Sequence, residues 1–521
     1  MGLIMQTGGG NEDKLLSLKK DFVLNAAFVL LILVILLTRV LIFFKVNLPC
    51  IDSDQPFMWA GVKDYSEGKF YEPRFYGQDY NTFLEALFAV PLYWLKVPVY
   101  YALPIATHFL SLFPFLFTAF YLFFHQRKEN ALLVLAVLLC LPLGYDIMSG
   151  IPRGFVSGLF FSSFFVISIL NPQNLKWLFI NSTLALTGYF VNPNSVLVSI
   201  PLLFYFFLMN YKNSKYYVVS LAALLWFIPL YFIFDYFYKI HPEYVVLDLH
   251  YNFTTAFFWD ILKHLDRHFA HVNFFVEEKA ISVLCVLLLI AIALFKENKR
   301  AFYALLCFLV VILLSFFSAK TKDGVVWPFY SYSRIFLGIP LFIAFASLMI
   351  HLRSRIIALS IIVVSLGFSA YKFFDFDRAL DCHTKHVEKW NGVHLMSINS
   401  VFESLNFFKK KCKENKTEHF LISNTFWLCT YMNYGGAVIM KDFPSTEETA
   451  AERRYWVREG NKDKVFEKFI FLSAKFDFDK RLSGTEKFTL KRLDDYGLFL
   501  VENNKVSNKD FLSLVRDLER K

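Results

Sequence analysis

The class of fold is decided by the stretch "FVLNAAFVLLILVILLTRVLIFFK" (22–45) and by "VNLPCIDSDQP" (46–56), which follows it directly. The first stretch is an apolar run long enough to cross the roughly 30 Å hydrocarbon core of a bilayer. Lysines stand before it, at Lys14, Lys19 and Lys20. Positive charge marks the cytoplasmic end of a span, so the second stretch, with Asp52 and Asp54, is predicted to lie outside.

Similar apolar runs recur along the 521 residues, of which 56% are hydrophobic. Soluble domains are only about 45–50% apolar. The pattern predicts a mainly α, polytopic membrane protein with about eleven spans. They are expected at residues 22–45, 99–124, 130–147, 154–170, 177–191, 195–210, 217–238, 280–295, 301–318, 335–350 and 356–373.

The net charge of +10 is explained by lysines and arginines in the short loops on one side of these spans. No basic face interleaved with aromatic residues is present, so a nucleic-acid partner is not expected. The longer polar loops fall on the opposite side. This pattern predicts residues 1–21 in the cytoplasm, 22–375 in the membrane and 376–521 on the outer side.

The last segment has the composition of a small soluble α/β domain. Residues 396–412 have the apolar spacing of an amphipathic helix. Short apolar runs bounded by polar residues predict strands at 419–423, 436–440, 468–473 and 496–502.

The first outer loop, 46–98, is the segment richest in candidate functional side chains. Residues 55–67 carry apolar side chains on one helical face, as in a helix on a membrane surface. Then follows "YEPRFYGQDYNTFLEALFAVPLYWL" (71–95), whose apolar half is interrupted by Glu85 and Pro91. That half is short for a span and predicts an interfacial or re-entrant helix.

This loop resembles that of the bacterial GT-C glycosyltransferases, the superfamily of protein O-mannosyltransferases and lipid A aminoarabinose transferases. The resemblance rests on an acidic pair opening a surface helix and on the string "YGQ-x-Y…LEA" within 51–95, with weaker similarity in 187–203 and 332–341. It implies a GT-C-like bundle in a bacterial inner membrane with residues 376–521 in the periplasm, a sugar donor linked to polyprenyl phosphate and an acceptor in the periplasm. The sugar and the acceptor are not implied.

The resemblance makes Asp54 the equivalent of the family's catalytic aspartate, the base that takes the acceptor proton. The family commonly has Asp-Glu here, whereas this chain has Asp54-Gln55. We infer from position alone that Asp52 could supply the missing carboxylate. Both aspartates are also good helix caps before Pro56, so capping and catalysis stay open as alternatives.

A phosphate leaving group gains negative charge and needs positive charge nearby. Three arginines on the outer side are candidates: Arg74, Arg153 and Arg334. The resemblance implies a phosphate-binding position at Arg334. Further candidates for substrate binding lie in the matched string, at Tyr76, Gln78, Tyr80 and Glu85. The tyrosines also suit an interfacial aromatic belt, and Glu85 an interfacial helix.

Asp146, at the outer end of the third span, could help to hold a divalent cation such as Mg²⁺ or Mn²⁺, since carboxylates are natural ligands. It could equally be a helix-end aspartate. The number of spans also suits a transporter or flippase, and Gln55 leaves a non-catalytic relative of the superfamily open.

Overall fold

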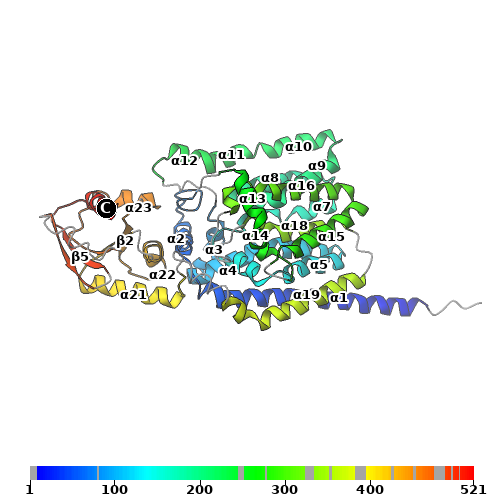
Figure 1. Ribbon diagram of the computed structural model, residues 1–521, viewed down its shortest axis with the longest axis horizontal. Coiled ribbons are helices and arrows are strands. Elements are labelled where there is room, and N and C mark those ends of the chain that lie inside the picture. Colours follow the sequence, from blue (N-terminus) through cyan, green and yellow to red (C-terminus); the bar gives the residue numbers. More distant parts are fainter. Residues whose placement is uncertain are drawn as a thin grey trace, which may run out of the picture.

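The computed structural model describes residues 9–78, 81–244, 252–275, 279–322, 334–350, 355–381, 395–423, 428–449, 453–473, 487–494, 497–503 and 505–520. Figure 1 shows a helical bundle with the C-terminal segment at one end. At the opposite end, the first helix extends beyond the bundle.

Each predicted span coincides with one or more helical segments. These are α1 (Gly9–Ile42) with η1 (Phe43–Asn47); α4 (Val99–Phe124); α5 (Lys128–Leu139) with α6 (Leu143–Gly150); η2 (Ser157–Ser162) with α7 (Phe165–Leu170); α8 (Leu175–Val191); η3 (Pro193–Ser195) with α9 (Val196–Asn210); α10 (Ser214–Leu224), α11 (Phe227–Tyr231), η4 (Phe232–Tyr236) and α12 (Phe237–Ile240); α15 (Ile281–Glu297); α16 (Lys299–Ser315); η6 (Arg334–Gly338) with α18 (Ile339–Ser347); and α19 (Arg355–Phe374).

In the described part of the chain, four helical stretches are long and apolar enough to cross a membrane: 21–47, 99–124, 193–210 and 214–240. A fifth is added if α5 and α6, which are bent by 91°, count as one. The break falls at Pro142, whose ring and missing N–H interrupt a helix. The other apolar helices are shorter, so the predicted count of about eleven spans is not confirmed.

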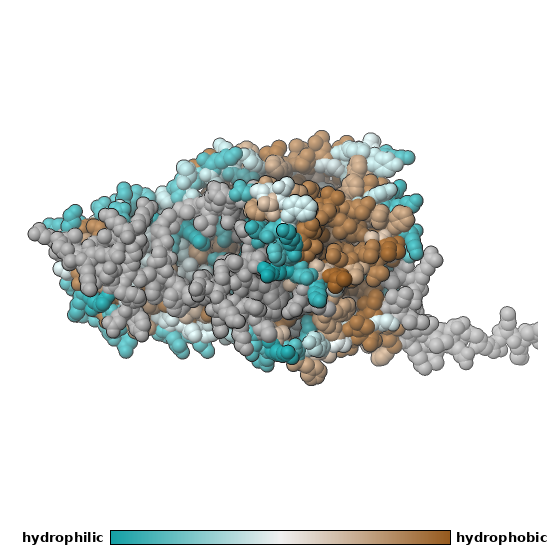
Figure 2. Space-filling model, in the orientation of Figure 1, coloured by the Kyte–Doolittle hydropathy of each residue, from teal (hydrophilic) through white to brown (hydrophobic). Residues whose placement is uncertain are grey.

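The outer surface of the bundle is apolar. Its exposed side chains include a long series on α10–α12, from Tyr217 to Ile240. Figure 2 shows hydrophobic residues gathered over the bundle and hydrophilic ones over the C-terminal end and its junction with the bundle. A large exposed apolar surface would be an aggregation liability in water, but it suits a bilayer. The membrane character predicted from the sequence is therefore supported.

The C-terminal segment forms a five-stranded sheet with helices. Its elements are α21 (Ile398–Glu414), β1 (His419–Ile422), η7 (Tyr431–Gly435), α22 (Gly436–Ile439), β2 (Ser445–Glu448), α23 (Tyr455–Asn461), β3 (Lys468–Leu472), β4 (Phe488–Arg492), β5 (Leu498–Asn503) and α25 (Asn508–Arg520). The strand order is β2-β1-β3-β5-β4, with β1 parallel to β2 and β3, and β5 antiparallel to β3 and β4. The small α/β fold predicted for this segment is confirmed.

The helix predicted at 396–412 and the strands predicted at 419–423, 468–473 and 496–502 correspond to α21, β1, β3 and β5. The strand predicted at 436–440 is wrong, because this stretch is helix α22. A Cβ on Gly435 would lie 3.1 Å from Trp59, and one on Gly436 would lie 2.4 Å from Phe443. The two glycines let the helix pack closely, and this packing overrides the β propensity of the stretch.

The remaining described helices are α2 (Gln55–Ser66), α3 (Leu84–Trp94), α13 (Thr255–Lys263), α14 (Leu265–Phe269), η5 (Ala270–Val272) and α17 (Ala319–Lys322). The helix predicted at 55–67 is α2, but its residues 55–62 are buried and do not lie on an open surface. Its side chains share one hydrophobic core with α3 and with residues of the C-terminal domain. Ile51 pairs with Met396 and accepts a hydrogen bond from Tyr431 Oη at 2.8 Å, so the junction is packed on both sides.

His419 makes the stability of the C-terminal domain sensitive to acid. Its ring stacks on Phe466 with centroids 3.7 Å apart, and burial lowers its pKa to about 3. The unfolded chain therefore takes up a proton below about pH 6.5, which the folded domain resists. Between pH 7 and 5 we expect the domain to lose about 2 kcal/mol.

Hydrogen exchange in β1 and β3 of the full-length protein, corrected for the intrinsic effect of pH, measures this loss. His419→Phe keeps a flat ring against Phe466 but cannot be protonated, so its exchange should depend less on pH. Equal pH dependence in the two proteins would contradict the assignment.

Candidate functional site

The two aspartates of the first outer loop have different tasks. Asp52 Oδ1 accepts hydrogen bonds from the backbone nitrogens of Asp54 at 3.0 Å and Gln55 at 3.2 Å, at the start of α2. The side chain of Asp54 makes no such capping bond. Capping therefore belongs to Asp52, and the carboxylate of Asp54 faces other partners.

Arg153 joins the two carboxylates. Its Nη1 lies 3.2 Å from Asp52 Oδ2, and its Nη2 contacts Asp54 Oδ2. The side chain of Asp52 is 1% exposed and that of Arg153 6%, whereas that of Asp54 is 18% exposed. Of these three predicted residues, Asp54 is the one that solvent or a ligand can reach most easily.

Two more arginines act on Asp54. The guanidinium of Arg334 lies 4.4 Å from the ring centroid of Phe155, and that of Arg153 lies 5.2 Å from the same centroid. Burial alone would raise the pKa of Asp54, but Arg153, Arg453 and Arg334 together hold it below its usual range. Asp54 is therefore an ionised carboxylate set among three cations.

Asp52 responds to the same surroundings in the opposite sense. Burial raises the pKa of Asp52, and Arg153 opposes this effect only in part. The neighbouring charge of Asp54 raises that pKa further. Of the two carboxylates, Asp54 is therefore the one held in its charged, proton-free form.

Polar side chains fix the backbone that carries Arg153. The carbonyl of Arg153 accepts from Asn81 Nδ2 at 3.3 Å, and the amide of Gly154 donates to Glu85 Oε1 at 3.1 Å. Gly154 has a φ of +74°, which favours glycine. Glu85, predicted as a substrate-binding candidate, is fully buried and positions this loop.

Asn192 is a second anchor, which the sequence analysis did not identify. Its Nδ2 donates to Asn81 Oδ1 at 2.8 Å and to the carbonyl of Gly154 at 2.6 Å, while its Oδ1 accepts from the amide of Asn194 at 2.8 Å. The "NPN" stretch at 192–194 ends one helix and begins the next, as its Pro suggests. Its asparagines also hold the loop of Arg153 from the opposite side.

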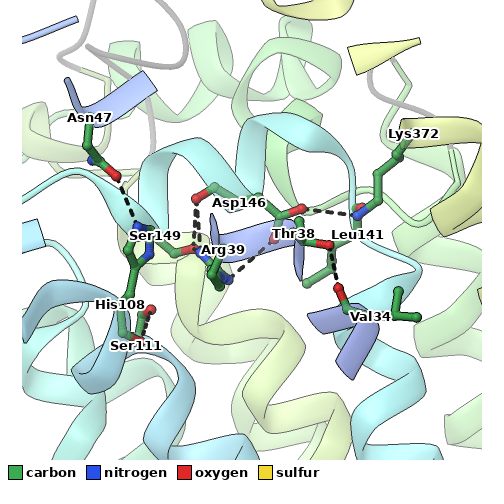
Figure 3. Close-up of polar contacts among 10 residues, drawn as sticks. All are labelled: Val34, Thr38, Arg39, Asn47, His108, Ser111, Leu141, Asp146, Ser149 and Lys372. Carbon is green, nitrogen blue, oxygen red and sulfur yellow. Dashed lines mark hydrogen bonds and ion pairs between the residues drawn. The ribbon is translucent and has the colours of Figure 1, made fainter. Parts of the chain in front are cut away.

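Figure 3 shows a further polar network at the start of this loop. Asp146 on α6 lies 3.3 Å from Arg39 Nη2 on α1 and 3.0 Å from Lys372 Nζ on α19. Arg39 Nη1 also donates to Ser149 Oγ at 2.9 Å, and Asn47 Nδ2 donates to the carbonyl of Gly150 at 2.9 Å. The network ties α6 to its neighbours directly before Arg153.

The charge of Asp146 is thus matched by two cations. Among the residues that the structure describes, no three His, Cys, Asp or Glu side chains lie together as metal ligands would. A divalent cation and a metal-binding role for Asp146 stay predictions without support from this geometry.

The other predicted binding residues of the first outer loop have the following surroundings, and their binding roles stay predictions. Arg74 Nη2 lies 2.7 Å from Asp235 Oδ1 of η4, and Tyr76 is fully buried with its hydroxyl donating to Asp64 Oδ2 at 2.7 Å. Gln78 is buried, and its Oε1 has no hydrogen-bond partner in the described part of the chain. Tyr80 lies outside the described residues.

Arg453 was missed by the sequence analysis. Its guanidinium lies 4.6 Å from the ring centroid of Phe57 on α2. Gly77 has a φ of +76°, and a Cβ there would lie 2.9 Å from Cγ and Cδ of Arg453. Nothing in the sequence links the C-terminal domain to the first outer loop, so only folding reveals this contact.

Comparisons with known proteins give limited information. No protein-family model and no curated protein matches the chain. Among solved structures, the crystal structure of ArnT from Cupriavidus metallidurans bound to undecaprenyl phosphate is similar, with 11% sequence identity and a TM-score of 0.42. The match covers 92% of this chain and 98% of that one. Similarity at this level assigns neither a fold family nor an activity.

Replacing Asn192 by Ala should loosen the loop of Arg153. The change removes the bonds to Asn81, Gly154 and Asn194 and leaves buried polar groups unpaired, which costs about 1–3 kcal/mol for each such group. Hydrogen exchange at the Gly154 amide should accelerate by at least about fivefold, since 1 kcal/mol corresponds to that factor.

Asn213→Ala is the matched control, because Asn213 caps α10 far along the chain from this loop and accepts from Lys215 N. Faster hydrogen exchange in Asn213→Ala should be confined to α10. Unchanged protection at Gly154 in the Asn192 variant would contradict the anchoring role.

Proposed function

We propose that this chain is a membrane glycosyltransferase of the GT-C type. It would move a monosaccharide from a polyprenyl-phosphate carrier to an acceptor hydroxyl or amine at the outer face of the membrane. The observation that carries the proposal is the ionised Asp54, the more exposed of the two outer-loop aspartates, set among three arginines where the apolar bundle meets the C-terminal domain. The resemblance of residues 51–95 to that superfamily supports the same reaction class.

Asp54 would act as the base. The acceptor oxygen or nitrogen attacks the anomeric carbon of the donor, and its proton passes to the carboxylate of Asp54. The bond between the anomeric carbon and the phosphate oxygen breaks on the opposite side, so the configuration inverts. Polyprenyl phosphate leaves as a phosphate monoester. Because Asp54 is held in its charged form, it can accept the proton without first losing one.

Arg153 and Arg334 would bind the phosphate. Their guanidinium groups lie against the same ring, Phe155, and can offer several N–H donors to one phosphate. Preorganised positive charge stabilises negative charge as it grows on the leaving oxygen. Donor phosphate would compete with Asp54 for Arg153, which would weaken the ion pair and make Asp54 a stronger base in the complex.

Gln55 replaces the acid that the superfamily commonly carries after its aspartate. The side chain is 1% exposed, and its Nε2 has no hydrogen-bond partner within the described residues. A buried amide without a partner is costly. We propose that this N–H donates to a sugar or phosphate oxygen of the bound donor, a role that glutamate could not fill in its charged form.

Replacing Asp54 by Asn should lower the rate of sugar transfer by about 10²–10⁴-fold, the usual contribution of a general base. Donor binding should persist, because the arginines remain. The assay is transfer by the purified protein in lipid from a polyprenyl-phosphate sugar to a mixture of envelope acceptors.

The matched control is Asp377→Asn, because the side chain of Asp377 is 77% exposed and its ion pair within the described residues, with Lys45, lies at the surface. It should transfer at the normal rate. Full activity of the Asp54 variant would exclude the mechanism. Movement of the lipid across vesicles without transfer would favour the transporter alternative, and neither activity would favour a non-catalytic relative.

The pH profile tests the role of Arg153. In the native protein, the pKa of Asp54 lies below its usual value of about 3.9, so kcat/KM should not fall between pH 7 and 5 through loss of this base. In Arg153→Gln, less positive charge opposes the effect of burial, so the pKa of Asp54 should rise. The acidic limb of the pH profile of the residual activity should therefore move to higher pH. An unmoved limb would contradict the assignment of Asp54 as base.

A further inference from the structure

Arg453 belongs to the C-terminal domain, but its side chain packs against the first outer loop and α2 of the bundle. Its aliphatic stem lies on Gly77, and its guanidinium lies over Phe57, both in the first outer loop and α2. Within the described part of the chain, Arg453 makes no hydrogen bond or ion pair. Its N–H donors are therefore available to a ligand, unlike those of Arg153, which contact two carboxylates.

The neighbours of Arg453 hold it in this place. Arg454 Nη2 donates to the carbonyl of Asn433 at 2.7 Å, and its guanidinium lies 4.7 Å from the ring centroid of Tyr434. Trp456 stacks on Tyr71 with centroids 3.9 Å apart and planes 8° from parallel. The segment 453–456 is thus fixed on both sides, and the position of Arg453 is set before any ligand arrives.

The two carboxylates and three guanidinium groups described for this site do not balance one another in charge. Asp52 and Asp54 contribute two negative charges and Arg153, Arg334 and Arg453 three positive ones. One positive charge is left over, or two if Asp52 is protonated. A phosphodiester carries about one negative charge, which matches this excess before transfer. The departing monoester carries about two at neutral pH, which matches the excess of two that remains once Asp54 has taken the acceptor proton.

We propose that Arg453 binds the phosphate of the lipid-linked donor together with Arg153 and Arg334, so that the C-terminal domain completes the donor site. The inference rests on the proposed function and deepens it. The bundle alone supplies the base and two arginines. The third arginine reaches Asp54 only when the C-terminal domain is docked on α2 and the first outer loop.

The test is the binding of a long-chain polyprenyl phosphate to the full-length protein in nanodiscs, without acceptor. Arg453→Ala should bind at least tenfold more weakly than the native protein. Arg453→Lys should fall between the two, because lysine keeps the charge but lacks the planar fork of donors. The matched control is Arg492→Ala, which removes an exposed guanidinium from the same domain and should bind normally.

Gly77→Ala gives a second test that keeps the charge. A Cβ at this position would displace the stem of Arg453. Gly77→Ala should weaken the binding of polyprenyl phosphate in the native protein, and should weaken it less in a protein that already carries Arg453→Ala. Equal effects in the two backgrounds would mean that Gly77 acts through backbone strain and would overturn this contact as the cause.

Normal binding by Arg453→Ala, with weakened binding by Arg153→Ala, would overturn the inference and leave the proposed function standing. A raised KM for the acceptor with unchanged donor binding would also overturn it, because the phosphate recognised would then belong to the acceptor. If Arg453→Ala bound phosphatidylglycerol and polyprenyl phosphate equally more weakly, Arg453 would be a general lipid contact, and the inference would be overturned. Failure of the native protein to bind polyprenyl phosphate would remove the proposed function as well.

Discussion

The contact of Arg153 with Asp52 and Asp54 is the interaction on which the rest of the site depends. Removing three charged groups from water costs several kcal/mol for each ion, and attraction offsets this only if the geometry is held. The fold meets that condition with hydrogen bonds between the Arg153 loop and the side chains of Asn81, Glu85 and Asn192. The need to hold these buried charges in a fixed geometry explains why the interior is polar at this end of an otherwise apolar bundle.

The need to hold buried charges in a fixed geometry also accounts for the shape of the bundle near the site. A straight span through residues 128–150 would carry its last turn away from the loop, whereas the break at Pro142 turns α6 across the bundle. Asp146 then meets Arg39 and Lys372 from two other helices. Breaking one partner of such a buried network leaves an uncompensated charge, so the arrangement is rigid.

Much of this architecture follows from the sequence. Apolar runs locate the helices, and the lysines before the first run predict that Asp54 lies on the outer side. Which aspartate caps α2 could not be predicted, because Asp52 and Asp54 both suit the position by type. The pairing of Asp54 with Arg153 spans 99 positions, and the contact of Gly77 with Arg453 spans more of the chain. Such contacts depend on tertiary packing, which no local pattern encodes.

The position of the site at a junction has a physical consequence. A charge on a fully solvated loop is screened by water, whereas the same charge between an apolar bundle and a packed domain acts through a lower effective dielectric. Core residues shared by α2, α3 and the C-terminal domain exclude water from one side of the site. Asp54 stays partly exposed on another. The three arginines therefore act strongly on Asp54, while part of its carboxylate stays accessible to solvent.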